Sequence, residues 1–159
     1  MSSKRSSSYR TSNVRSKRSL PKMEQTVDDQ LVSVNVSLRA AYEPIVQLPA
    51  SIKLLQEEGR GEDVPKIGAL CRSIASDIKI FTEERDKISS EWQETRKNRP
   101  TDNSGMAEYN MKITTTGLDY INLNQRIAET VLKSKQDFEE ILEGRAPSAP
   151  STPPQESHA

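Results

Sequence analysis

The fold of this chain is decided by residues 27–55, which read VDDQLVSVNVSLRAAYEPIVQLPASIKLL. Apolar side chains recur there every seven positions, in two series that are offset by three. One series is Leu31, Leu38, Ile45 and Ile52, and the other is Val27, Val34, Ala41, Leu48 and Leu55. These are the a and d positions of a heptad repeat, which places one apolar stripe along an α-helix. The stretch therefore predicts a long amphipathic helix over about residues 24–58.

Two prolines interrupt this first helix. Pro44 and Pro49 each remove a backbone hydrogen bond, and a proline in a helix interior costs about 3 kcal/mol. Neither proline occupies an a or d position. We therefore expect a kink near residues 44–49, with the apolar stripe continuing across it.

A second helix is predicted over residues 64–97, after the linker Gly59-Arg60-Gly61. Asp63 is suited to cap its first turn, and Pro65 is tolerated there. The heptad pattern continues in two series, in which Arg85 is the single polar member. They are Ile67, Ile74, Phe81 and Ile88, and Val64, Cys71, Ile78, Arg85 and Trp92.

A third helix is predicted over about residues 106–142, after a loop over residues 98–105. Its pattern is less regular. One face carries Ile113, Tyr120, Ile127, Val131, Phe138 and Ile141, and the residues that widen it are Leu118, Ile121, Ala128, Leu132 and Leu142. Three threonines and Gly117 lower the helix propensity of residues 114–117, so a short strand over residues 112–116 is the alternative. Gly144 is placed to end the helix.

The two ends differ in composition from the helical region, residues 23–143. Residues 1–22 are rich in serine and arginine, and residues 144–159 contain four prolines. Neither segment has enough apolar surface to offset the entropy of ordering, so both are predicted to be disordered. The sequence as a whole predicts an all-α fold: an elongated three-helix bundle or helical hairpin with coiled-coil character, flanked by disordered tails.

The net charge of zero conceals a separation of charge along the chain. Residues 1–22 contain seven basic side chains and no acidic one, whereas residues 23–143 contain 15 basic and 22 acidic ones. A basic arm attracts phosphate groups, anionic lipid or acidic protein surfaces. The candidates for contacts with a phosphate backbone are Lys4, Arg5, Arg10, Arg15, Lys17, Arg18 and Lys22.

Residues that could carry out chemistry are scarce. The one histidine, His158, lies in the proline-rich end, and the one cysteine, Cys71, occupies an apolar heptad position. A small buried hydrophobe is the ordinary role for such a cysteine. We therefore expect no catalytic residue, no metal site, no cofactor and no small-molecule substrate. A lone cysteine fits a reducing, intracellular location, with cytoplasm and nucleus both open. No apolar run approaches the roughly 18 residues that a transmembrane helix needs.

The heptad stripes are the strongest indication of function. They predict a structural or adaptor subunit that assembles with itself or with other helical chains. We define the predicted interaction seam as Leu31, Val34, Leu38, Ala41, Ile45, Leu48, Ile52, Leu55, Ile67, Cys71, Ile74, Ile78, Phe81, Ile88 and Trp92. Further apolar positions beside the stripes are expected to stay only partly covered in a three-helix bundle, which favours oligomerisation. They are Val32, Val36, Val46, Leu54, Ile80 and Leu123.

The alternative function is that of a nucleic-acid-associated assembly factor that uses residues 1–22 to hold phosphate backbones. The small subunits of viral DNA-packaging enzymes and of transcription complexes are broadly of this shape, but no motif assigns the chain to either class. Pro147-Ser148-Ala149-Pro150 resembles the late-domain motif that a subunit of the ESCRT-I complex recognises. Four residues in a proline-rich segment are too few to decide whether this tetrapeptide is a recognition element.

Overall fold

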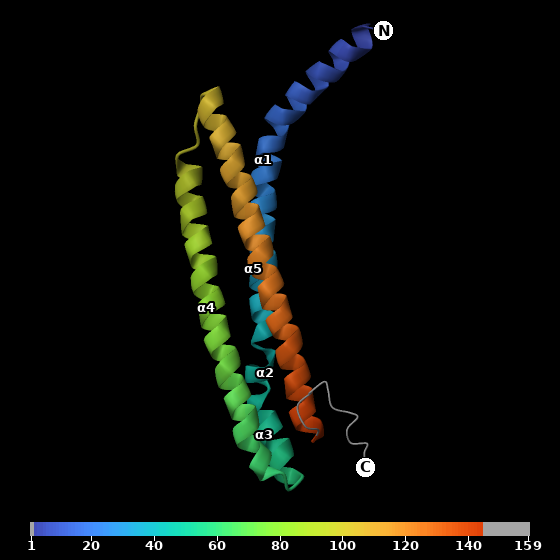
Figure 1. The fold of residues 1–159 in the computed structure, drawn as a ribbon, viewed down its shortest axis with the longest axis vertical. Coiled ribbons are helices and arrows are strands. Elements are labelled where there is room, and N and C mark those ends of the chain that lie inside the picture. Colours follow the sequence, from blue (N-terminus) through green and yellow to red (C-terminus); the bar gives the residue numbers. More distant parts are fainter. Residues whose placement is uncertain (1, 145–159) are drawn as a thin grey trace, which may run out of the picture. The chain divides into compact units, whose positions relative to one another are not determined.

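The fold is all-α. The computed structural model describes the backbone of residues 2–144 and the side chains of residues 20–144, and it contains helices but no strand within that range. The helices are α1 (Ser2–Ala41), α2 (Glu43–Val46), α3 (Leu48–Glu57), the 3₁₀ turn η1 (Gly61–Asp63), α4 (Val64–Lys97) and α5 (Asn103–Glu143). The three predicted helical stretches are therefore confirmed, with the first one divided (Figure 1).

The division of the first stretch lies at the two prolines. Helix α1 ends at Ala41. Pro44 lies in the first turn of α2, and Pro49 lies in the first turn of α3. A proline is favourable in a first turn, because the N–H that it lacks has no partner inside the helix there. The kink predicted near residues 44–49 is confirmed, and it consists of two helix breaks, at Tyr42 and at Gln47.

Helix α1 begins much earlier than the heptad pattern predicts. Its backbone is helical from Ser2, and Pro21 lies inside it. The segment before Pro21 contains neither glycine nor proline, so nothing in its sequence blocks a helical backbone, although it has no apolar stripe to bury. The helical backbone therefore starts at Ser2 and not near Glu24, as the heptad pattern predicts. The side chains of residues 1–19 and all of residues 145–159 lie outside the described part, which also contains neither His158 nor the Pro147–Pro150 motif.

The turn between α3 and α4 requires a glycine. Gly59 has a φ of +72°, the left-handed conformation that side chains disfavour. The N–H of Arg60 donates to the carbonyl of Leu55 (2.7 Å) and that of Gly59 to the carbonyl of Gln56 (3.1 Å). This pair of bonds is a Schellman motif, which satisfies the last carbonyls of α3.

Helix α5 begins at Asn103, earlier than predicted, and continues without interruption to Glu143. Asp102 starts it, since its carboxylate accepts a hydrogen bond from the N–H of Gly105 (3.3 Å) and its carbonyl one from the N–H of Met106 (2.9 Å). Residues 112–116 are helical, so the alternative of a strand there is wrong. Helical periodicity of the neighbouring apolar residues outweighs the low propensity of the threonines and Gly117.

The helices form two compact units. Unit 1 consists of Met1–Asn35 and Glu84–Asn124, and unit 2 of Val36–Glu83 and Gln125–Ala159. Within unit 1, α1, α4 and α5 bury Val27, Val34, Trp92, Tyr109, Ile113, Tyr120 and Leu123. Within unit 2, a cluster of Leu55, Ile67, Cys71 and Phe138 joins α3, α4 and α5. Each unit therefore has a core of its own, made from segments far apart in sequence.

Candidate interaction surfaces

The predicted interaction seam lies inside the two units. None of its members is exposed: ten are buried, and Leu31, Ile45, Leu48, Ile52 and Ile88 are half-buried. The heptad stripes of the first two helical stretches are thus covered by the chain's own helices. Because these side chains form the cores, a surface that is open to another chain consists of other residues.

The polar member of the second stripe, Arg85, has a partner within unit 1. Its guanidinium donates to the side-chain oxygen of Asn35 on α1 (3.0 Å) and to the carboxylate of Asp86. On the same helix, the hydroxyls of Ser89 and Tyr120 form a hydrogen bond of 2.7 Å between α4 and α5. The interruption in the heptad pattern is therefore a polar contact between helices, which lets a charged side chain occupy a stripe position.

A buried carboxylate joins α1 to α5 in unit 1. Glu24 is only 4% exposed, and it accepts hydrogen bonds from the guanidinium of Arg99 and from the hydroxyl of Tyr109. Burial opposes ionisation of Glu24, but the hydrogen bonds from Tyr109 and Arg99 outweigh it, so the pKa of this carboxyl lies below its ordinary value. The apolar periodicity does not predict this cluster, because Glu24 precedes the heptad pattern and Arg99 lies in a loop.

A second charged pair lies one turn further along α1. Arg96 of α4 binds Asp28 through two parallel hydrogen bonds of 3.1 Å, and its guanidinium stacks 5.4 Å from the ring centre of Trp92. The ring of Trp92 in turn stacks on that of Tyr109, with centres 6.1 Å apart. Such bidentate and stacked contacts suit arginine's planar group. Together with Glu24 they fix the register of the three helices in unit 1.

Arg60 plays a comparable part in unit 2. It pairs with Asp63 (2.9 Å) and donates to the carbonyl of Leu142 (2.6 Å) and to that of Ile141 at the end of α5. The last carbonyls of a helix have no partner within it, and a cation there also complements the helix dipole. The side chain that the sequence places in a simple linker thus caps a helix more than eighty residues away.

Cys71 has the structural role that its heptad position predicts. It is buried in the core of unit 2, and its thiol donates to the carbonyl of Pro44 (3.6 Å), one of the groups beside the break in the first helix. Burial raises the pKa of the Cys71 thiol, which disfavours the reactive thiolate.

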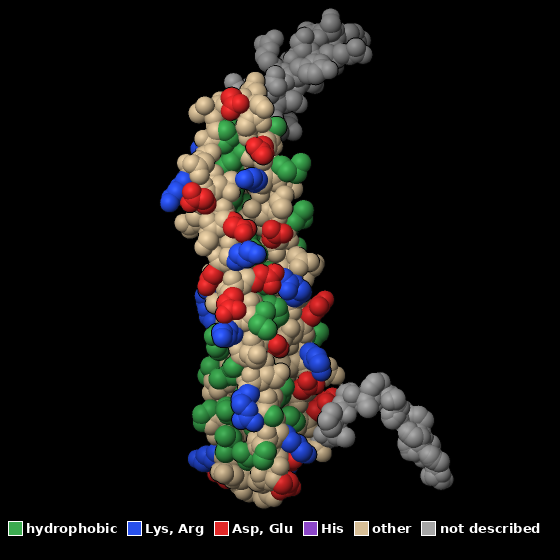
Figure 2. Space-filling view, turned by 60° about the vertical axis from the view of Figure 1, so that its left-hand side comes forward, with side chains coloured by type: hydrophobic (Ala, Val, Ile, Leu, Met, Phe, Trp, Pro, Cys, Tyr) green, Lys and Arg blue, Asp and Glu red, His purple; other side chains and the backbone are tan. Residues whose placement is uncertain are grey.

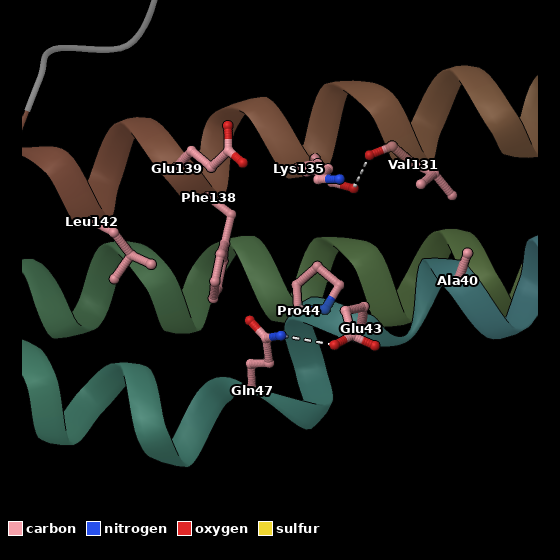
Figure 3. A pocket seen from close by; sticks show the side chains of 10 residues that line it. Ala40, Glu43, Pro44, Gln47, Val131, Lys135, Phe138, Glu139 and Leu142 are labelled. Atoms are coloured by element: carbon pink, nitrogen blue, oxygen red, sulfur yellow. Dashed lines mark hydrogen bonds between the residues drawn. The ribbon is translucent and has the colours of Figure 1, made fainter.

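The break between α1 and α3 opens a pocket of about 590 Å³ in unit 2 (Figure 3). Figure 3 shows Phe138 and Leu142 of α5 on one side and Pro44 and Gln47 on the other. The rim is polar, and the amide of Gln47 donates to the carboxylate of Glu43 (2.7 Å). An apolar floor with a polar rim can accept an apolar side chain.

Large apolar side chains reach the surface in both units, and Figure 2 shows them between interspersed acidic and basic groups. Of the positions predicted to be partly covered, Val32, Val36, Val46, Leu54 and Ile80 are exposed. Leu123 is the exception: it is 0% exposed, so the prediction that it is only partly covered is wrong.

The error at Leu123 arises from the face assigned to the third helix. The buried positions of α5 include Tyr109, Ile113, Tyr120, Leu123 and Ile127, whose spacing of three and four residues defines the true core face. Of the five residues expected to widen that face, four are exposed and lie outside it: Leu118, Ile121, Ala128 and Leu132. The fifth, Leu142, is half-buried and packs against the core of unit 2. Helix α5 therefore carries a second, outward apolar face.

Of the basic candidates for phosphate contacts, only Lys22 has a described side chain, and it is exposed on α1. Lys4, Arg5, Arg10, Arg15, Lys17 and Arg18 lie among the residues whose side chains are not described. Within residues 20–144, no group of three or more histidine, cysteine, aspartate or glutamate side chains could hold a metal ion. No helix among the described residues is long and apolar enough to cross a membrane.

Comparison of the chain with models of known protein families, with characterised proteins and with solved structures finds no match.

Proposed function

We propose that this protein is a non-enzymatic structural or adaptor subunit that assembles with itself or with other helical chains. The observation that carries the proposal is the set of large apolar side chains left exposed although both cores are complete. In unit 2 these include Val46, Ile80 and Leu132, each more than half exposed. Apolar surface of this kind, rimmed by charges, is typical of places where another chain binds.

The surfaces used for assembly differ from those that the heptad pattern alone suggests. The seam residues hold each unit together, so a partner that bound them would have to displace the chain's own helices. The exposed apolar side chains are available without such rearrangement. Assembly of a folded chain through them also leaves the charged contacts of Arg60 and Glu24 intact.

The test is affinity purification of the full chain, combined with sedimentation of the purified protein. We expect a helical partner chain, or a second copy, to be retained by the wild type and lost from the variant Val46→Glu/Leu132→Glu. Ser73→Glu is the matched control, since Ser73 is an exposed polar residue of the same unit. Circular dichroism of each variant confirms that the helices persist. A wild type that sediments as a monomer and retains no chain in stoichiometric amount would contradict the proposal.

A second candidate function, nucleic-acid binding, rests on one observation, the seven basic and no acidic residues in 1–22. Binding to a DNA or RNA duplex would then weaken steeply with salt, with a slope that reports the number of phosphate contacts. Fluorescence anisotropy of a labelled duplex, measured over a salt series, tests this. Removal of residues 2–22 should abolish the binding. Absence of binding by the full chain at low salt would exclude this function.

A further inference from the structure

The pocket of about 590 Å³ in unit 2 lies between α5 and the break in the first helix. Its floor contains Phe138, which is 6% exposed, and the half-buried Val131 and Leu142. Phe138 and Leu142 extend into it from α5 (Figure 3). The buried hydroxyl of Ser134 donates to the carbonyl of Val131 (3.2 Å), so it is already paired within α5. The floor therefore suits an apolar ligand.

The rim of the pocket supplies hydrogen-bond donors. Lys135 is exposed there and has no hydrogen-bond or ion-pair partner among the described residues. The amide of Gln47 donates one N–H to the carboxylate of Glu43 (2.7 Å), and a side-chain amide has a second N–H to donate. A ligand with apolar side chains and unpaired backbone carbonyls fits such a site. Polyproline II segments have both properties, because their backbone forms no internal hydrogen bonds.

A proline-rich segment of this same chain follows directly after the pocket. Leu142 is the last residue of α5 that lines the pocket, and it stands two positions before Gly144. Gly144 has a φ of +79°, the left-handed conformation that ends a helix and turns the chain away from its axis. Residues 145–159 come next and read RAPSAPSTPPQESHA. A chain that turns back at Gly144 passes over the pocket.

The prolines of this segment have a spacing that matches the pocket. Pro147, Pro150 and Pro153 recur every three residues, and a polyproline II helix has three residues per turn, so on such a helix they share one face. At about 3.1 Å per residue, that face is about 19 Å long. The floor extends along α5 from Val131 to Leu142, which at about 1.5 Å per residue is about 16 Å. The two lengths agree to within about 3 Å.

The charges are complementary as well. Glu43, Lys135 and Glu139 line the pocket and together have one negative charge in excess. Residues 145–155 contain Arg145 and no acidic side chain. Glu139 is about one turn of α5 before Leu142, so a segment that enters beside Leu142 brings opposite charges together.

Attachment to the same chain favours this segment over a separate proline-rich chain. Pro147 is three residues from Gly144, and a short linker gives an effective concentration of about 1 mM. A separate peptide of the same sequence would bind weakly, with a dissociation constant on the order of 100 μM. The ratio of these two values predicts that the pocket is occupied by the chain's own segment for about 90% of the time.

We propose that this pocket is an intrachain docking site, in which residues 147–153 pack as a polyproline II segment with Pro147, Pro150 and Pro153 on the floor. This docking goes beyond the proposed function, since it concerns a different surface of unit 2 and a different occupant. The docked segment closes the pocket to other chains and covers one face of Pro147–Pro150. A protein that binds either of them must first displace the segment.

The first test is nuclear Overhauser spectroscopy of the isotope-labelled full chain. We expect cross-peaks between protons of Pro147 or Pro150 and the ring of Phe138. The exchange Pro150→Ser/Ser151→Pro keeps the composition but moves one proline off the shared face, so it should remove most of this signal. Ser148→Ala/Ser151→Ala leaves the prolines in place and should retain it. Absence of the cross-peaks from the wild-type chain overturns the proposal.

The second test is binding of a fluorescein-labelled peptide of residues 145–159, followed by fluorescence anisotropy. The full-length variant Pro147→Ala/Pro150→Ala/Pro153→Ala should bind the peptide with a dissociation constant on the order of 100 μM. The wild type should bind it about tenfold more weakly, because its own segment competes at an effective concentration of about 1 mM.

A pair of substitutions in the triple variant shows where the peptide binds. Ala40→Trp should abolish binding, because Ala40 is an exposed residue of the pocket lining and a large side chain there fills the space. Ala69→Trp is the matched control, at an exposed position of α4 outside the pocket lining. It should change the dissociation constant by less than about twofold. Circular dichroism should show the same helicity for both.

Each remaining outcome decides against intrachain docking. Equal affinity of the peptide for the wild type and the triple variant would show that the pocket is open to another ligand. Failure of the triple variant to bind the peptide would show that the pocket does not recognise the segment. Cross-peaks found only between differently labelled copies in a mixed sample would assign the occupant to a second copy. The proposed function is tested separately, because Val46 and Leu132 lie outside the pocket lining.

Discussion

Replacement of Gly117 by alanine should stabilise the monomer, although it removes no clash and adds no contact. The residue is inside α5, its φ is not positive, and a Cβ there has nothing within 4 Å. Alanine is favoured over glycine in a helix interior by about 0.8–1.0 kcal/mol, mostly because it restricts the unfolded chain. We expect an increase of about 0.5–1 kcal/mol in the free energy of unfolding. For a chain of this size that raises Tm by about 1–4 °C.

Gly59→Ala is the matched control variant, and its expected effect on stability is the opposite. The chemical change is the same and a Cβ again meets nothing within 4 Å, but the φ of Gly59 is +72°. The left-handed conformation costs a residue with a side chain about 1–2 kcal/mol, which outweighs the entropic gain. Tm should therefore fall by a few degrees.

The assay is thermal unfolding followed by circular dichroism at 222 nm, at a protein concentration low enough to keep the chain monomeric. Equal shifts for the two variants, or a loss of stability in Gly117→Ala, would refute the reasoning. In the second case Gly117 would be in contact with something within the monomer. The paired design removes any general effect of a methyl group from the comparison.

Three further changes have definite expected results. Arg60→Met keeps the length of the side chain but loses the bonds to the carbonyls at the end of α5, so hydrogen exchange of the last turn of α5 should quicken severalfold while the middle of α4 is unaffected. Glu24→Gln should reduce the fall in the free energy of unfolding at acid pH. The pKa of Glu24 is lower in the folded protein than in the unfolded chain, so its contribution to the free energy of unfolding is complete above about pH 4.5. That contribution is lost as the pH falls through the folded pKa. Urea unfolding between pH 3 and pH 6, roughly the range in which carboxyls titrate, measures this, and identical slopes for the two proteins would contradict it. The Cys71 thiol should react with a maleimide far more slowly than free cysteine in the folded protein and at a similar rate after denaturation, because burial raises its pKa and blocks access.

The heptad pattern was sufficient to predict the first two helical stretches and most of their buried side chains. Residues such as Val34, Leu55, Ile67 and Ile78 recur at a fixed spacing, and on a helix that spacing places them on one side. The two prolines also predict where the first stretch breaks, because a proline lacks the backbone N–H that a helix interior needs. Both inferences need only the geometry of a single helix.

The third helix shows where periodicity alone is insufficient. Its residues offer two faces, one through Tyr120 and Leu123 and one through Leu118 and Ile121, and both are apolar. Which of them turns inward depends on the neighbouring helices, with which Tyr109 and Tyr120 form hydrogen bonds through their hydroxyls. The pattern of a single helix carries no information about those partners, and it therefore does not predict that Leu123 is buried.

The spacing of apolar residues and prolines along each helix is enough to predict that the chain is helical, where its helices break, and which side of the first two stretches is buried. What those stripes pack against depends on the arrangement of the helices in space. The structure shows that the seam closes on the chain's own helices, that Arg60 caps α5 and Arg99 binds Glu24, and that an apolar face beside Gly117 is left open. Such contacts join residues many positions apart, and their geometry exists only once the helices are packed together.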